Sequence, residues 1–183
     1  AIGAIGPPDY LALLKDLAAN DRDVEVRETS ELAYDRIKFF EENPEKKHLM
    51  ENRFKSVDPA PRSEETSLKK LGEALMDTQL SLFERYRAMF GLRDILPKME
   101  SEEKKKECIE ALLNGFNEKK SALFRHEIAF VFGQLGEEAA HGTARLAEVV
   151  DDELEHGMVR HEAAEALGNM GNEMADACLK KHR

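Results

Sequence analysis

Residues 125–136 read RHEIAFVFGQLG, and residues 160–171 read RHEAAEALGNMG. The two segments share the Arg, the His, the Glu, an Ala and both glycines, and most of their apolar positions match by type. His161 follows His126 by 35 residues. A motif that returns at an interval of about 30 to 40 residues indicates a repeat protein built from stacked helix pairs.

A third, shorter copy of the motif ending stands at residues 2–6, which read IGAIG. Gly3 aligns with Gly133 and Gly168, so the matching His would lie five residues upstream of Ala1. We therefore expect the sequence to begin inside a motif.

Helical periodicity runs through most of the chain, and no alternating pattern of five or more residues predicts a strand. The triplets at residues 27–29 (RET) and 85–87 (RYR) take the place of RHE, so we expect the scaffold to recur at least four times. The predicted fold is all-α, with HEAT-like helical hairpins stacked as an α-solenoid. Helices are predicted over residues 10–17, 24–37, 68–76, 80–95, 102–116, 122–135, 139–150, 158–170 and 174–181.

The helical pattern fails between residues 44 and 66, where Pro44, Pro59 and Pro61 stand among mixed charges. Prolines at this spacing do not fit packed helices, because each lacks an N–H and clashes with the preceding turn. We predict a linker over residues 44–66, between a first part at residues 1–43 and a second part at residues 67–183.

The motif glycines have a structural explanation. Gly136 and Gly171 are expected to close their helices in the left-handed conformation, and Gly133 and Gly168 to let a neighbouring backbone come close. No strand precedes these glycines, so they do not indicate a phosphate-binding loop.

Composition narrows the function classes. The formal net charge of −10 disfavours non-specific binding to nucleic acid and suits a basic or polyamine-like partner. No apolar run approaches about twenty residues, so no membrane span is expected. Cys108 and Cys178 lack the spacing of a zinc site or a disulfide framework. We interpret both as buried thiols in a reducing compartment and expect a cytoplasmic protein.

The His-Glu dipeptides are the candidate functional residues. Neighbouring residues on a helix lie about 100° apart, so one helix can present an imidazole and a carboxylate to the same concave surface. This ligand set, without thiolate, favours non-haem iron over structural zinc and leaves positions open for dioxygen or substrate. By ligand type alone, manganese and catalytic zinc also fit.

A structural explanation of the repetition is equally open. Duplication of a helix pair would copy the motif without any site, with Arg–Glu pairs between adjacent helices holding the stack together. We interpret His141 and His156 as surface or helix-capping residues, and we assign no role to His48 or His182.

Together these segments resemble the deoxyhypusine hydroxylase family. The resemblance covers essentially the whole chain, and other HEAT-like proteins share the helix pairs but not these motifs with this linker. It rests on RHEIAFVFGQL at residues 125–135, MVRHEAAEALGNMG at residues 158–171, LFERYRAMFGLRD at residues 82–94 and SVDPAP at residues 56–61.

The resemblance implies two facing halves of four repeats each, with four His-Glu motifs around a di-iron centre. It also implies a monooxygenase that uses dioxygen to hydroxylate the deoxyhypusine side chain of a 5A-type translation factor, which completes hypusine. In this sequence His126, His161 and Glu162 match the ligands of one iron. Glu127 matches the carboxylate that contacts the amine-bearing substrate.

Under this resemblance, residues 1–43 are the terminal repeat of a first half, and residues 67–183 are most of a second half with two of the four motifs. We therefore expect the chain alone to be inactive and to bind iron weakly or not at all. Apolar repeat ends suggest association between copies of the chain. The competing functions are a non-catalytic HEAT-repeat scaffold and a HEAT-like lyase that handles a chromophore.

Overall fold

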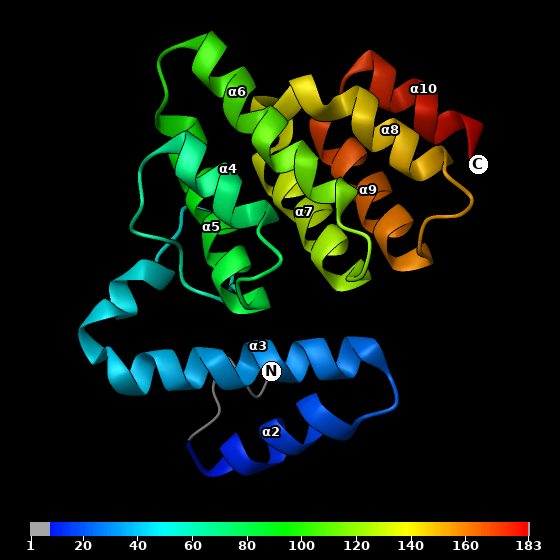
Figure 1. Cartoon of the computed structure of the whole chain (residues 1–183). Helices are drawn as coiled ribbons and strands as arrows, with labels where there is room; N and C mark the ends of the chain where they lie inside the picture. The colour runs from blue at the N-terminus through cyan, green and yellow to red at the C-terminus, as the bar shows by residue number, and fades with distance from the viewer. Residues whose placement is uncertain (1–7, 183) are drawn as a thin grey trace. The chain divides into compact units, whose positions relative to one another are not determined.

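The computed structural model describes residues 8–182, and every regular element in that range is helical (Figure 1). This confirms the all-α prediction. The α-helices are α2 (Leu11–Asn20), α3 (Val24–Glu42), α4 (Leu68–Met76), α5 (Leu82–Ile95), α6 (Glu102–Leu113), α7 (Ala122–Leu135), α8 (Thr143–Asp151), α9 (Gly157–Met170) and α10 (Glu173–Lys181). Short 3-10 helices are η1 (Pro8–Tyr10), η2 (Pro44–Met50), η3 (Leu96–Lys98), η4 (Asn114–Asn117) and η5 (Gly136–Gly142).

Most predicted helix bounds agree with the structure within a few residues, and those of α4 and α7 agree at both ends. The prediction was wrong for the start of α8, which begins at Thr143 rather than at residue 139. Ala139 has φ −104° and ψ 21°, which breaks the helical path inside η5. None of the described helices is both long and apolar enough to cross a bilayer.

The chain divides into two compact units, residues 1–91 and residues 92–183. This division falls inside α5, whereas the sequence pattern placed the start of the second part at residue 67. The division into residues 1–43, 44–66 and 67–183 therefore stays a prediction about family architecture. The motif copy proposed at residues 2–6 lies outside the described residues.

Residues 44–66 contain no α-helix, as their prolines predict, but the segment is packed into the first unit. Pro44 opens η2, where a missing N–H costs no helical hydrogen bond. The Asn52 side-chain amide donates to the Met50 carbonyl at 3.2 Å and to the Asp58 carboxylate at 3.1 Å. Asp58 is only 4% exposed. This segment is therefore fixed by its own hydrogen bonds rather than being an open connection.

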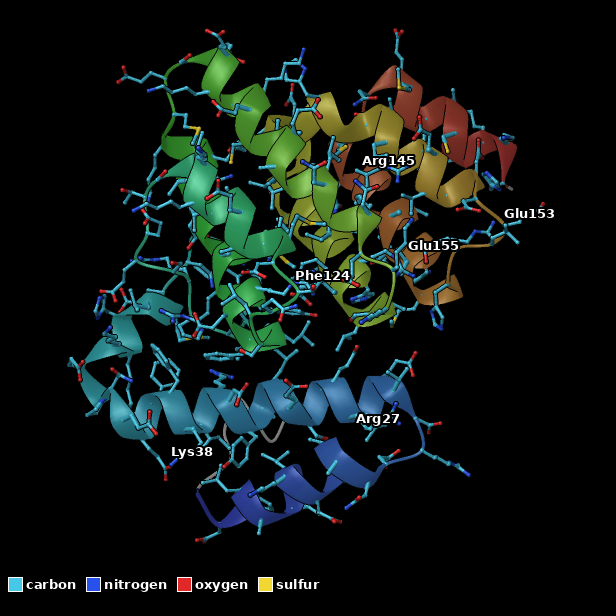
Figure 2. All side chains as sticks on the ribbon, in the orientation of Figure 1. Arg27, Lys38, Phe124, Arg145, Glu153 and Glu155 are labelled. Carbon is cyan, nitrogen blue, oxygen red and sulfur yellow. The ribbon has the colours of Figure 1, made fainter. Side chains whose placement is uncertain are left out.

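Four arginines at equivalent repeat positions bind carbonyls at the end of the helix that precedes their own. The nitrogen–oxygen distances are 2.7 to 3.0 Å. A cation there satisfies free carbonyls and complements the helix dipole. Figure 2 labels the first of these arginines, near the turn between α2 and α3. The pairs are Arg27 with Asp21, Arg85 with Leu75, Arg125 with Glu118 and Arg160 with Val150. The RET, RYR and RHE triplets thus share one structural role.

In the second unit, α7 packs along α9, and α10 contacts both α8 and α9. The apolar residues of α7 recur at helical spacing and are fully or almost fully buried. Phe132 stacks on Phe116 with ring centroids 6.3 Å apart. The buried residues of α7 are Phe124, Ile128, Ala129, Val131, Phe132 and Leu135, and those of α9 are Val159, Ala163, Ala166, Leu167 and Met170.

The motif glycines differ in their surroundings. Gly171 closes α9 in the left-handed conformation, at φ 60° and ψ 27°, as predicted. Gly136 also has a positive φ, 55°, which favours glycine, but its ψ of −129° lies outside the left-handed helical region, so the prediction was wrong for its conformation. A Cβ at Gly133 would lie 3.4 Å from the Ala166 Cα, so α7 and α9 approach closely there, as predicted. The matching expectation for Gly168 was wrong for the described residues, since nothing lies within 4 Å of a Cβ there.

This contrast predicts that replacing glycine by valine has different effects on stability at positions 133 and 168. Gly133→Val is expected to lower the free energy of unfolding by about 1 to 3 kcal/mol, because the added carbons press on the backbone of α9. Gly168→Val should leave stability unchanged or slightly higher, because valine has the better helix propensity and open space is available. Urea unfolding of the two variants checks this. Equal destabilisation by both would contradict the packing described.

Candidate metal centre

The two RHE triplets span the end of the first turn and the start of the second in α7 and α9, the helices that pack against each other. Ser121 caps α7, with its Oγ accepting from the Phe124 N–H at 2.9 Å. His156 caps α9, with its Nδ1 accepting from the Met158 N–H at 3.3 Å. This confirms His156 as a capping residue. Each cap stands four residues before the motif arginine, so both triplets begin at the same point of their helices.

His126 and Glu162 meet across the two helices. The His126 Nε2 lies 3.2 Å from the Glu162 Oε2, and the two side chains are 26% and 13% exposed. The other ring nitrogen of His126, Nδ1, is buried without a hydrogen-bond partner. The contact therefore joins the His of one motif copy to the Glu of the other in a half-buried place.

The surroundings of His126 are acidic. The hydrogen bond to Glu162 raises the pKa of His126 above its ordinary value of 6.5, against the opposing effect of burial. The charges of Glu162, Glu127 and Glu165 act in the same direction as the hydrogen bond. The protonated imidazole therefore stabilises the folded chain. That stabilisation is complete below about pH 6.5 and is lost as the pH rises through the raised pKa.

We expect Glu162→Gln to bring the pKa of His126 down toward its ordinary value, because the variant loses the carboxylate that holds the proton. The His126 ring resonances followed by NMR across the pH range measure this directly. The stability gained by the wild-type chain below about pH 6.5 should shrink in the same variant. An unchanged pKa would contradict the contact.

His161 does not join this pair. Its Nε2 lies 3.0 Å from the Glu165 Oε1 one helical turn away, and both side chains are mostly exposed, at 73% and 60%. His126, His161 and Glu162 are not among the groups of residues 8–182 that place one ligand atom each within 4.8 Å of one another. The structure thus brings two of the predicted ligands together and leaves the third beside them. Their role as ligands of one ion, and that of half-buried Glu127 as a substrate contact, stay predictions.

The arginine of the first triplet has a different partner. Arg125 donates two hydrogen bonds to the Glu155 carboxylate, at 2.8 and 2.7 Å, and one to the Glu118 carbonyl at 2.9 Å. Burial acts to raise the pKa of Glu155, but hydrogen bonds from Arg125 and from the His156 N–H outweigh it and leave that pKa lowered. The structural explanation of the motif therefore holds for its arginine. It does not account for the contact between His126 and Glu162.

Comparison with known proteins identifies the relationship. Residues 159–179 match the family model of the PBS lyase HEAT-like repeat. The chain is 46% identical over 168 residues to the deoxyhypusine hydroxylase of Emericella nidulans, which covers 87% of this chain and 48% of that protein. The chain is a homologue of the deoxyhypusine hydroxylases.

Other comparisons agree. The hydroxylase of Debaryomyces hansenii is 45% identical over 141 residues, covering 74% of this chain and 42% of that protein. The solved structure of human deoxyhypusine hydroxylase in complex with glycerol matches with a TM-score of 0.85 and 41% identity, covering 99% of this chain and 58% of that chain. The chain spans about half the length of the curated hydroxylases it matches.

The donor groups fit the ion that the hydroxylase resemblance implies. An imidazole nitrogen and a carboxylate oxygen stand 3.2 Å apart, and neither motif copy contains a cysteine, which suits iron rather than a metal that prefers thiolate ligands. The buried Nδ1 of His126 has no hydrogen-bond partner, so the imidazole lacks the second hydrogen bond that commonly orients a metal-binding histidine. Sequence reasoning missed Glu165 as the partner of His161, although their i,i+4 spacing is the available signal.

Proposed function

We propose that this chain supplies one half of the metal centre of a deoxyhypusine hydroxylase, which hydroxylates the deoxyhypusine side chain of a 5A-type translation factor. The observation that carries this proposal is the 3.2 Å contact between the His126 Nε2 and the Glu162 Oε2. It joins the two motif copies through their candidate ligands. Identities of 41 to 46% with proteins of that name support the same reading.

In this proposal His126, His161 and Glu162 hold one iron ion, which would activate dioxygen for insertion of an oxygen atom into a substrate C–H bond. His161 exchanges its contact with Glu165 for the ion. His126 binds the ion only in its neutral form. Because acidic neighbours raise the pKa of His126, protons compete with the ion for this ligand at a higher pH than they would for an ordinary histidine.

The acidic groups around His126 have a second use in the proposal. Glu127 is the residue that would bind an ammonium group of the substrate, through a charge-assisted hydrogen bond. The charges of Glu162 and Glu165 add to the negative potential there. A net charge of −10 favours the approach of a cationic, polyamine-derived side chain.

A hydroxylation assay tests the proposal. The substrate is a deoxyhypusine-containing 5A protein, supplied with ferrous iron, dioxygen and a chemical reductant that provides the two electrons needed to reduce the second oxygen atom to water. A complete hydroxylase that contains these residues is expected to form hypusine, and the 183-residue chain alone is not. Hypusine formed by the chain alone would overturn the claim that it holds half a site. An iron-loaded complete protein without turnover would favour the scaffold alternative.

Two further parts of the proposal concern context. We propose a cytoplasmic location, which the two free cysteines, Cys108 and Cys178, support. Association between copies through apolar repeat ends stays a prediction.

A further inference from the structure

The geometry points to a second metal site, separate from the His-Glu motifs, in which Asp151, Cys178 and His182 bind one zinc ion between α8 and α10. One ligand atom from each residue lies within 4.8 Å of the others. No other three such side chains among residues 8–182 gather in this way. The proposal is independent of the proposed hydroxylase function.

Two helices bring these residues together. Asp151 is the last residue of α8, and His182 follows directly after α10. Cys178 lies on α10 and His182 stands four residues later, just past its end, and a ligand atom of each lies within 4.8 Å of the other. Cys178 lies against α8, with its Sγ 4.0 Å from the Ala147 carbonyl oxygen. A bound ion would therefore fasten α10 to α8.

The Asp151 carboxylate is already oriented for this role. Its Oδ1 lies 2.5 Å from the His182 Nε2, and its Oδ2 lies 2.7 Å from the Lys181 Nζ. An ion replaces the contact between Oδ1 and the imidazole, while Lys181 keeps Oδ2 and holds the carboxylate in place. Metal ligands are commonly fixed by such an outer hydrogen bond.

The donor set selects the ion. Imidazole, thiolate and carboxylate together suit zinc, and three protein ligands leave the fourth tetrahedral position to water. Burial raises the pKa of the Cys178 thiol, Asp151 raises it further, and Lys181 acts against them. Zinc must therefore displace the thiol proton, which passes to solvent as the Zn–S bond forms. Binding should weaken as the pH falls.

Cobalt(II) is a suitable probe, because a thiolate ligand gives it an intense charge-transfer absorption that imidazole and carboxylate do not. Titration of the 183-residue chain with cobalt is expected to produce this band, and zinc is expected to abolish it. Cys178→Ser should remove the band, and His182→Asn should weaken cobalt binding by about tenfold or more. Zinc should also raise the melting temperature of the wild-type chain but not that of Cys178→Ser.

Matched controls use the residues of the same kinds elsewhere. Cys108 is fully buried and burial raises its thiol pKa to about 12, so Cys108→Ser should leave the band unchanged. His141→Asn and His126→Ala should do the same, since the motif site contains no sulfur. Absence of the band in the folded wild-type chain, or its persistence in folded Cys178→Ser, would overturn the proposal. Neither result bears on hydroxylation.

Discussion

In a complete hydroxylase that contains these residues, Glu162→Gln is expected to lower hydroxylation of the 5A-type substrate by about a hundredfold or more. Glutamine keeps the size of the side chain but removes the charge that lies 3.2 Å from the His126 Nε2. Loss of an outer partner of a metal ligand already costs about ten- to a hundredfold in affinity or activity, so loss of a ligand should cost at least as much. Turnover and iron content measured on the same samples check this.

Glu165→Gln is the matched control. Glu165 lies on the same helix, is largely exposed, and contacts His161 rather than His126. The variant should keep most of the activity, because the proposal has His161 leave Glu165 for the ion. Equal losses in the two variants would mean that general acidity, and not the contact between His126 and Glu162, supports the reaction.

Arg125→Ala is expected to lower the free energy of unfolding by about 3 kcal/mol, near the lower end of the range for a broken buried ion pair. The guanidinium makes a bidentate pair with Glu155 and also binds the Glu118 carbonyl. Its removal leaves Glu155, whose side chain is 12% exposed, without its main partner. Chemical denaturation measures the loss.

Arg145→Ala supplies the comparison. Arg145 pairs with Glu148 at 2.9 Å, but the side chains are 39% and 66% exposed. We expect a loss of about 0 to 1 kcal/mol, because solvent screens this pair. Figure 2 labels both Arg145 and Glu155. Similar losses of unfolding free energy in Arg125→Ala and Arg145→Ala would show that the buried pair stabilises the chain no more than the exposed pair does.

The Arg125 effect should depend on pH. The pKa of Glu155 is lowered in the folded chain, so the stabilisation it contributes is present above the ordinary value of 4.5. It is lost as the pH falls through the lowered pKa. The difference between the wild type and Arg125→Ala should therefore narrow in acid. A difference that widens in acid would contradict this assignment.

The sequence predicted most of the helical scaffold because apolar spacing and the repeated arginine act locally. The bounds of α4 and α7 follow from caps and periodicity alone. The start of α8 was not predictable in this way. Alanine favours helices, so nothing in the sequence indicates that Ala139 adopts non-helical φ and ψ. The prediction of close packing at Gly168 was wrong for another reason. Whether a glycine allows close packing depends on a neighbour, and none lies within 4 Å there.

The ligand roles of the candidate site residues stay a prediction, but part of their arrangement follows from the repeat. Repeat register places the two triplets at the same point of packed helices. Register alone does not show that His126 contacts Glu162, a non-equivalent position of the other triplet. The direction of the His161 side chain was not predictable from register either, because His161 contacts Glu165 on its own helix instead of the residues of α7. The cluster at Asp151 was not predictable from sequence spacing, because Asp151 lies about thirty residues before Cys178 and His182 and only the packing of α10 on α8 brings the three together.

Iron content in single variants of a complete hydroxylase tests most directly the claim that His126, His161 and Glu162 bind one ion. The complete protein is loaded anaerobically with ferrous iron, and bound iron is measured for the wild type and for alanine variants at each position. We predict that each variant loses half of the iron, His161→Ala included. Full iron content in His161→Ala would contradict the proposed ligand set and leave His161 as the exposed partner of Glu165.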